Sequence, residues 1–212
     1  MIDVAVPRIK ICGVTSLGDA DVVAEAGADA IGLIYAASVR QVSSNAASDI
    51  VARYGRDLWC VGVFRSQEDS EIVRVVERDG LRVVQLHEPA SESLLEALKV
   101  REVKVVRAVT LQSPPLTAHE RSTVVAVIVD SAQPGSGVAN DWAALAALHF
   151  EIPMLIAGGL TPENVDRAIS LTSAWGVDVA SGVESGHGVK DHDKVASFVT
   201  RARAALTQKG AQ

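Results

Sequence analysis

The chain alternates strictly between short apolar runs and helical stretches. Eight runs rich in β-branched residues have the length of buried strands, and segments rich in Ala, Glu and Arg separate them. Parallel strands need such crossover helices, and each β–α–β unit is right-handed. Eight units in a row predict an α/β fold, a compact (β/α)8 TIM barrel, with a doubly wound open sheet as the alternative. The expected strands cover residues 8–12, 30–35, 59–64, 83–87, 104–109, 124–130, 154–157 and 177–180. The expected helices cover residues 16–26, 46–54, 67–79, 91–99, 116–120 (the weakest), 142–148, 163–171 and 191–205.

The length and composition predict one domain. A chain of 212 residues that is 48% hydrophobic can bury one sizeable core. We expect residues 1–206 to form the barrel and residues 207–212 to form a frayed tail. The formal net charge is −6 and no basic stripe is present, which argues against nucleic-acid binding.

The sequence contains no pattern for membrane insertion, secretion or metal binding. No apolar stretch approaches the length of a membrane span, and the N-terminus lacks a signal-peptide pattern. We therefore expect a cytoplasmic protein with no membrane partner. The two cysteines, Cys12 and Cys60, stand outside any CxxC or Cys/His metal pattern, so no metal site is predicted. Cys60 lies in the middle of an apolar run and is expected to pack in the core.

Two glycine-rich strand ends near the C-terminus predict a phosphate site. Residues 156–164 and 179–184 each run from an apolar strand into small residues and then open a helix. In a (β/α)8 barrel the loops after the seventh and eighth strands form a phosphate cup in this way, because N–H groups at helix starts face the anion. We therefore expect a phosphorylated small molecule as the ligand. Its candidate ligands are Gly158, Gly159, Ser181 and Gly182.

Cys12 ends the first expected strand, and catalytic residues of barrels lie at strand ends. Lys10 stands two residues earlier and points to the same face. An ammonium beneath the thiol favours the thiolate and is expected to lower the pKa of Cys12, which suits a general base. The alternative is that Cys12 is a small buried hydrophobe, as most free cysteines are.

Two further strand ends carry titratable residues. Asp130 follows a continuous apolar run, so it is either the cap of the next turn or a general acid or base at the barrel mouth. His87 ends the fourth expected strand, where it either binds substrate or forms a hydrogen bond within a loop. The sequence leaves both alternatives open.

Three loop segments add weaker candidates. Arg40 lies in the loop after the second strand; it is either a solvated surface charge or a bidentate clamp for a carboxylate. Gly137 lies in a glycine-rich loop that is either a mobile cover of the mouth or a plain connection. Asn140 or Asp141 is the expected N-cap of the helix at 142. Lys190 near the last helix is expected only to cap and solvate it.

The strand ends together resemble phosphoribosylanthranilate isomerase, the third enzyme of the tryptophan pathway. The similarity follows the order of that family from residue 10 to residue 191, and its first and last two segments are specific. The matching segments are residues 10–15, 84–87, 135–137 with 141–142, 157–165, and 181–184 with 188–191.

The resemblance implies a (β/α)8 fold and an Amadori rearrangement of N-(5-phosphoribosyl)anthranilate. It assigns the general base to Cys12, the general acid to Asp130 and the contact with the anthranilate carboxylate to Arg40. His87 and Gly137 are expected among the substrate-binding residues. The chemistry it implies needs no metal and no redox cofactor. We expect a monomer or a homodimer.

Departures from the family pattern leave two other functions open. The loop at residues 34–40 lacks the lysine and both prolines that the family carries, and Glu88 stands where the family has glycine. One alternative is a related isomerase that acts on another phosphoribosyl amine. The other is a non-catalytic barrel that binds a phosphorylated ligand.

Overall fold

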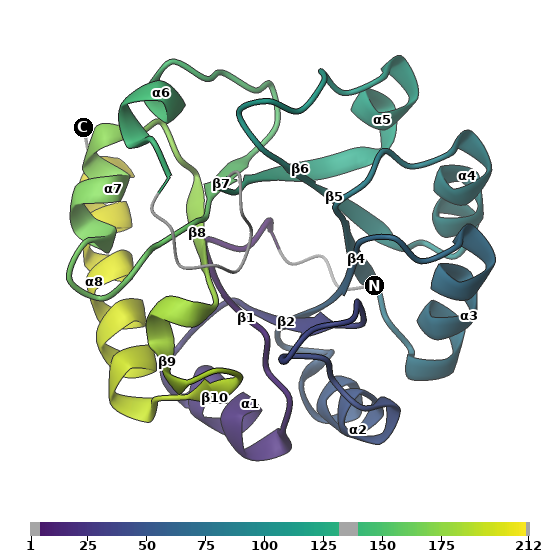
Figure 1. The fold of residues 1–212 in the computed structure, drawn as a ribbon, viewed down its shortest axis with the longest axis horizontal. Coiled ribbons are helices and arrows are strands. Elements are labelled where there is room, and N and C mark those ends of the chain that lie inside the picture. The colour runs from purple at the N-terminus through teal and green to yellow at the C-terminus, as the bar shows by residue number, and fades with distance from the viewer. Residues whose placement is uncertain (1–4, 132–139, 211–212) are drawn as a thin grey trace.

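A computed structural model describes residues 5–131 and 140–210 of the chain (Figure 1). Eight parallel strands form a closed barrel in sequence order, and the helices lie in a ring outside it. Pairing of β1 with β8 closes the sheet, with Ile9 opposite Val177, so the (β/α)8 prediction is confirmed and the open-sheet alternative is excluded. The strands are β1 Ile9–Cys12, β2 Ala30–Ile34, β3 Trp59–Phe64, β4 Val83–Leu86, β5 Lys104–Val109, β6 Val124–Val129, β7 Met154–Ile156 and β8 Gly176–Val179. The helices are α1 Leu17–Glu25, α2 Ser44–Tyr54, α3 Asp69–Asp79, α4 Glu92–Val100, α5 Ala118–Thr123, α6 Trp142–Ala146, α7 Val165–Leu171 and α8 His192–Gly210.

The strands are apolar throughout because both of their faces are buried. Along β2, Ala30 belongs to a small cluster inside the barrel, whereas Ile31 packs in the larger layer between strands and helices. Cys60 lies in that outer layer, so its predicted packing role is confirmed. Alternation of this kind follows from the period of two in a strand. It also carries each inward-facing polar side chain toward the barrel axis.

Short polar residues start the helices where the sequence suggests. The side chain of Asp141 accepts a hydrogen bond of 3.0 Å from the backbone N–H of Ala144, so Asp141 is the N-cap of α6. Helix α5 is longer than its weak signal suggested. Thr117 and Glu120 form a reciprocal capping box there, which satisfies two backbone N–H groups at the helix start.

Two features near the C-terminus differ from the expectation. A short turn, η1 (Ser181–Val183), leads into an antiparallel hairpin of β9 (Glu184–Gly186) and β10 (Val189–Lys190), which the sequence did not predict. Helix α8 continues through residues 207–210, where we expected a frayed tail. The ammonium of Lys209 donates to the backbone oxygens of Ile169, Thr172 and Ala174, which anchors the last turn of the helix.

Within the described ranges, no helix has the length and apolar character needed to cross a membrane.

Candidate active site

The carboxyl ends of the strands surround a cavity of about 170 Å³. A smaller recess of about 40 Å³ adjoins it, and both are lined by Asp130, Asp178 and Ala180. Most of the predicted site residues therefore meet at one mouth, while Gly137 lies outside the described residues. The polar lining of the cavity is Cys12, Ser38, Arg40, Arg65, Gln85, His87, Asp130 and Asp178. The recess contains the four predicted phosphate ligands, Gly158, Gly159, Ser181 and Gly182.

Cys12 ends β1 above a buried ion pair. Lys10 lies beneath it as predicted, and its Nζ donates to Asp178 Oδ1 at 2.8 Å. Burial disfavours the charge on Lys10, but the carboxylate of Asp178 outweighs that effect and holds the pKa of Lys10 above its ordinary value. Lys10 is therefore an ammonium at neutral pH.

The expected lowering of the pKa of Cys12 is wrong. Burial is the largest effect, and it raises the pKa of the thiol above its ordinary value. The positive charge of Lys10 and its hydrogen bond to the thiol act in the opposite direction, but the negative charge of Asp178 offsets part of them. The resting residue is a thiol whose thiolate, once formed, is strongly basic.

Asp130 follows β6 and faces both the cavity and the recess. Burial, with the nearby charge of Asp178, raises the pKa of Asp130 to about 6, although the backbone N–H of Ser131 and the charges of Lys10 and Arg65 oppose the shift. The carboxyl can therefore hold or release a proton near neutral pH. Its Oδ1 also accepts a hydrogen bond from the backbone N–H of the next residue, Ser131, at 2.7 Å. The turn that Asp130 was expected to cap continues into residues 132–139, which lie outside the described residues.

His87 and Gln85 form a polar pair in the lining of the cavity. The Nε2 atoms of the two side chains lie 3.1 Å apart. Burial, helped by the charges of Arg65, Lys10 and Arg107, lowers the pKa of His87 to about 3, so its imidazole is neutral. Gln85 is buried, and within the described part of the chain its Oε1 has no hydrogen-bond partner.

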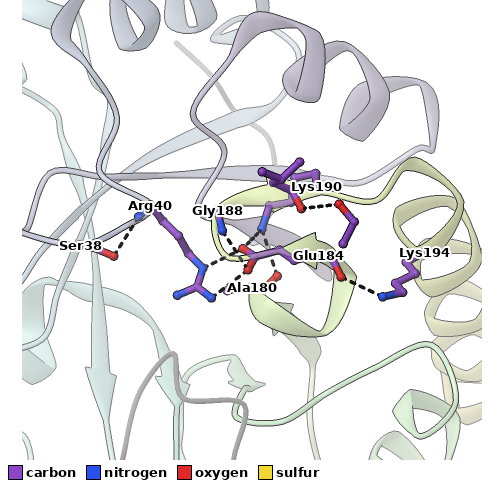
Figure 2. A network of polar contacts seen from close by, with 9 residues as sticks. Ser38, Arg40, Ala180, Glu184, Gly188, Lys190 and Lys194 are labelled. Atoms are coloured by element: carbon purple, nitrogen blue, oxygen red, sulfur yellow. Dashed lines mark hydrogen bonds and ion pairs between the residues drawn. The ribbon is translucent and has the colours of Figure 1, made fainter.

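Arg40 lines the cavity, but a carboxylate of this chain already binds it. Its Nε and Nη2 donate to the two oxygens of Glu184 at 2.7 and 2.8 Å. Figure 2 shows Glu184 between Arg40 and Lys190. The expectation that Lys190 only caps a helix is wrong, because its side chain is buried and its Nζ donates to Ala180 O and to Glu184 Oε1, each at 3.0 Å.

The two glycine loops pack tightly enough to form a defined cup. Gly158 and Gly159 adopt positive φ angles of 86° and 64°, which glycine tolerates without strain. The side chain of Asn164 fixes this loop: its Oδ1 accepts from Thr161 N at 2.8 Å and its Nδ2 donates to Gly159 O at 2.9 Å. A Cβ atom at Gly182 would lie 1.8 Å from the carbonyl oxygen of Leu160, so the two loops are in backbone contact.

Sequence comparison decides the family. The sequence profile described as N-(5'phosphoribosyl)anthranilate (PRA) isomerase matches residues 9–201. The chain belongs to this isomerase family. The relative from Cellvibrio japonicus, an N-(5'-phosphoribosyl)anthranilate isomerase, is 38% identical over 211 residues, which cover 96% of this chain and 98% of that protein.

Solved structures of phosphoribosylanthranilate isomerases agree with the fold. The enzyme from Thermus thermophilus is 34% identical and superposes with a TM-score of 0.81, covering 93% of this chain and 98% of that one. A second isomerase structure, solved in complex with reduced 1-(o-carboxyphenylamino)-1-deoxyribulose 5-phosphate, is 31% identical with a TM-score of 0.78. It covers 94% of this chain and 100% of that chain.

In this member of the isomerase family, sequence reasoning missed several buried polar residues of the site. Asp178 and Gln85 stand inside apolar strands, and the period of two along each strand places both on the inward face. The inward position of these two residues could therefore have been predicted from the alternation along their strands. Glu184 and Lys190 had no comparable signal, because their burial depends on the hairpin folding back against the loop of Arg40.

We expect Gly182→Ala to destabilise the protein by about 1–3 kcal/mol. The added methyl group meets a backbone oxygen, which cannot rotate away as a side chain does. Urea denaturation measures the change in the free energy of unfolding. Gly186→Ala is the matched control, since among the described residues, its two chain neighbours aside, none has an atom within 4 Å of the added methyl group. Equal stability of the two variants would refute the close contact of the loops.

Proposed function

We propose that the chain converts N-(5-phosphoribosyl)anthranilate to 1-(2-carboxyphenylamino)-1-deoxyribulose 5-phosphate, the isomerase step of tryptophan biosynthesis. The observation that carries the proposal is the meeting of Cys12 and Asp130 at one cavity that opens into the recess between the two glycine loops. A phosphorylated sugar held in that recess extends past Asp130 toward Cys12. The site thus offers a proton donor, a proton acceptor and an anchor for phosphate.

Asp130 acts first, as the general acid. Opening of the ribofuranose requires a proton on the ring oxygen, while the nitrogen lone pair of the substrate forms a Schiff base. A carboxyl whose pKa is raised to about 6 by burial is partly protonated near neutral pH and can supply that proton. An exposed aspartic acid, with a pKa near 3.9, is almost fully ionised there.

Cys12 then acts as the general base. Its thiolate removes the proton from C2 of the Schiff base, and the resulting enolamine tautomerises to the ketone. The raised pKa makes the thiolate scarce but strongly basic, and the adjacent ammonium of Lys10 stabilises it when it forms. Asp178 holds that ammonium in place through the 2.8 Å hydrogen bond.

Binding at both ends of the substrate aligns the sugar between acid and base. We assign the phosphate to Gly158, Gly159, Ser181 and Gly182, which line the recess and belong to the loops after β7 and β8. We assign the anthranilate carboxylate to Arg40 at the other end. Fixing both ends converts ring opening and proton abstraction into steps of a single positioned complex.

The direct test is turnover by the purified protein. Conversion of N-(5-phosphoribosyl)anthranilate is followed by the loss of anthranilate-type fluorescence, and we expect saturable turnover without added metal. Rescue of a tryptophan auxotroph by the coding sequence is the corresponding test in cells. A folded protein that leaves the fluorescence unchanged and fails to rescue would contradict the proposal.

A second candidate substrate is another phosphoribosyl amine. The observation that favours it is the occupation of Arg40 by Glu184, which removes one carboxylate-binding edge of the guanidinium. Turnover of a phosphoribosyl amine without a carboxylate at a higher kcat/KM than the anthranilate compound would support this candidate.

We expect Gly32→Ala to lower kcat about 10- to 100-fold. Gly32 is the partner of Cys12 in the pairing of β1 with β2. An added Cβ would lie 2.6 Å from the sulfur of Cys12 and 3.0 Å from Lys10 Nζ, so both groups must shift. Steady-state kinetics measure the loss, and Gly18→Ala, whose nearest neighbour lies at 4.0 Å, is the control. Wild-type kcat in a folded Gly32→Ala protein would refute the tight packing around the thiol.

A further inference from the structure

Arg40, Glu184 and Lys190 form a buried cluster that joins two loops of the barrel mouth. The three side chains are 6%, 8% and 4% exposed. Glu184 accepts from Arg40 through both oxygens, from Lys190 at 3.0 Å and from the backbone N–H of Gly188 at 3.3 Å. Four donors on one carboxylate leave it little freedom to rotate, so the loop after β2 and the hairpin β9–β10 are held together (Figure 2).

This contact selects which edge of Arg40 faces a ligand. A guanidinium can bind a carboxylate in bidentate fashion through its Nε–Nη2 edge or through its Nη1–Nη2 edge. Glu184 occupies the first edge. In Figure 2 one terminal nitrogen of Arg40 points away from Glu184, and Arg40 lines the cavity. The Nη1–Nη2 edge is therefore the one that remains for a ligand.

The aliphatic part of the Arg40 side chain is confined, as is its guanidinium group. A Cβ atom at Gly13 would lie 2.8 Å from Cδ of Arg40, so the backbone of the loop after β1 packs directly on the side chain. A Cβ atom at Gly188 would lie 2.8 Å from the carbonyl oxygen of Val39. Both sides of the Arg40 loop are thus in contact with backbone, and the guanidinium is a preorganised group.

The charges of the cluster favour an anion in the cavity. Arg40 and Lys190 are the two basic groups, and Glu184 lies between them as the one carboxylate. Burial lowers the pKa of Lys190, while the adjacent carboxylate of Glu184 favours its charged form. A buried positive charge without a counter-charge is costly, so a negative group of a ligand stabilises it. The thiolate of Cys12 is the competing candidate, because it lies close enough to interact electrostatically with both cations.

We propose that Glu184 is a positioning residue, which holds Arg40 by its Nε–Nη2 edge so that the Nη1–Nη2 edge binds the carboxylate of the substrate. The proposal rests on the proposed function and makes Glu184 and Lys190 determinants of selectivity for a carboxylated aminoaldose. Lys190 contributes by donating a hydrogen bond to Oε1 of Glu184, which helps to hold that carboxylate in place. Neither residue touches the substrate.

Calorimetric binding of two non-reacting probes tests the proposal independently of turnover. One probe is reduced 1-(2-carboxyphenylamino)-1-deoxyribulose 5-phosphate, and the other is the phenylamino compound without the carboxylate. We expect the wild-type protein to bind the carboxylated probe about tenfold more tightly, the effect of one charge-assisted hydrogen-bond pair. In Glu184→Gln this preference should fall to about twofold or less, with little change in affinity for the other probe.

Steady-state kinetics and a matched control variant distinguish a positioning role of Glu184 from a role in protein stability alone. Glu184→Gln should raise KM for the carboxylated substrate while kcat changes by less than about threefold, and Glu184→Asp, which keeps the charge, should recover part of the affinity. Glu120→Gln is the control, because Glu120 forms a similarly buried ion pair with Arg107 of β5, and neither residue is among those that line the cavity. It should destabilise the protein without changing the preference between the probes.

Three outcomes would overturn the proposal. The first is an unchanged preference in Glu184→Gln, or the absence of any preference in the wild-type protein. The second is an equal loss of affinity for both probes in Glu184→Gln, or a fall in kcat with no change in KM. Either result would indicate that the cluster acts on the thiolate of Cys12. The third is loss of the preference in Arg65→Gln but not in Glu184→Gln, which would assign the carboxylate to Arg65, the other arginine that lines the cavity. A protein that binds the probes but does not turn over N-(5-phosphoribosyl)anthranilate would contradict the proposed function. That result is distinct from the three outcomes above.

Discussion

Replacement of Cys12 by alanine is expected to lower kcat by about 10²- to 10⁴-fold, the usual contribution of a general acid or base. The thiol lies at the end of β1, is 6% exposed and lines the cavity beside the ammonium of Lys10. No other thiol in the described ranges lines that cavity. Alanine fills most of the same space, so circular dichroism and the unfolding midpoint should remain close to those of the wild-type protein.

Cys60 supplies a matched control for this prediction. It is also a buried, free cysteine, but it lies in the outer layer between the barrel and the helices, and burial raises the pKa of its thiol to about 12. Cys60→Ala should therefore cost some stability and leave kcat within a few-fold of the wild-type value. Wild-type turnover by Cys12→Ala, or an equal loss in both variants, would refute the assignment of the base.

Asp130→Asn is expected to lower kcat/KM by about 10²- to 10⁴-fold at low pH, because asparagine has no proton to give to the ring oxygen. The pH dependence of the loss identifies the group. In the wild-type enzyme the protonated fraction of Asp130 is nearly constant below its pKa of about 6 and falls about tenfold per pH unit above it. The variant has no such titration.

The ratio of wild-type to variant kcat/KM should therefore be constant below about pH 6 and fall at higher pH. Titration of the substrate phosphate and of Cys12 affects both proteins and cancels in this ratio. Asp166→Asn is the control, since Asp166 pairs with Arg201 on the surface, and its ratio should stay near one. A flat ratio for Asp130→Asn across this range, or unchanged turnover, would contradict the role of Asp130 as the acid.

The sequence alone predicts the barrel because its strands are continuously apolar and its helices separate them regularly. The alternation along each strand also predicts that Lys10 lies beneath Cys12, and the structure confirms it. Strand ends in a parallel barrel share one mouth, so Cys12, Asp130, Arg40 and His87 meet there even though they are distant in sequence.

The remaining features depend on tertiary packing. The pKa of Cys12 moves opposite to the prediction because the extent of its burial, which outweighs the charge of Lys10, cannot be read from the strand pattern. Glu184 and Lys190 look like solvated residues of a polar turn, and only the folding of the hairpin against the Arg40 loop buries them. The contact of Glu184 with one edge of the Arg40 guanidinium is therefore visible only in the structure.

We propose that one ligand spans the site, with its phosphate in the glycine loops and its carboxylate at Arg40. A crystal structure of this protein with the reduced product analogue tests it most directly. We predict the phosphate within hydrogen-bond distance of the backbone N–H groups of the loops at Gly158–Gly159 and Ser181–Gly182, and the carboxylate on the Nη1–Nη2 edge of Arg40. The sugar should then lie between Cys12 and Asp130. A phosphate bound elsewhere, or a sugar out of reach of the Cys12 sulfur, would contradict the account.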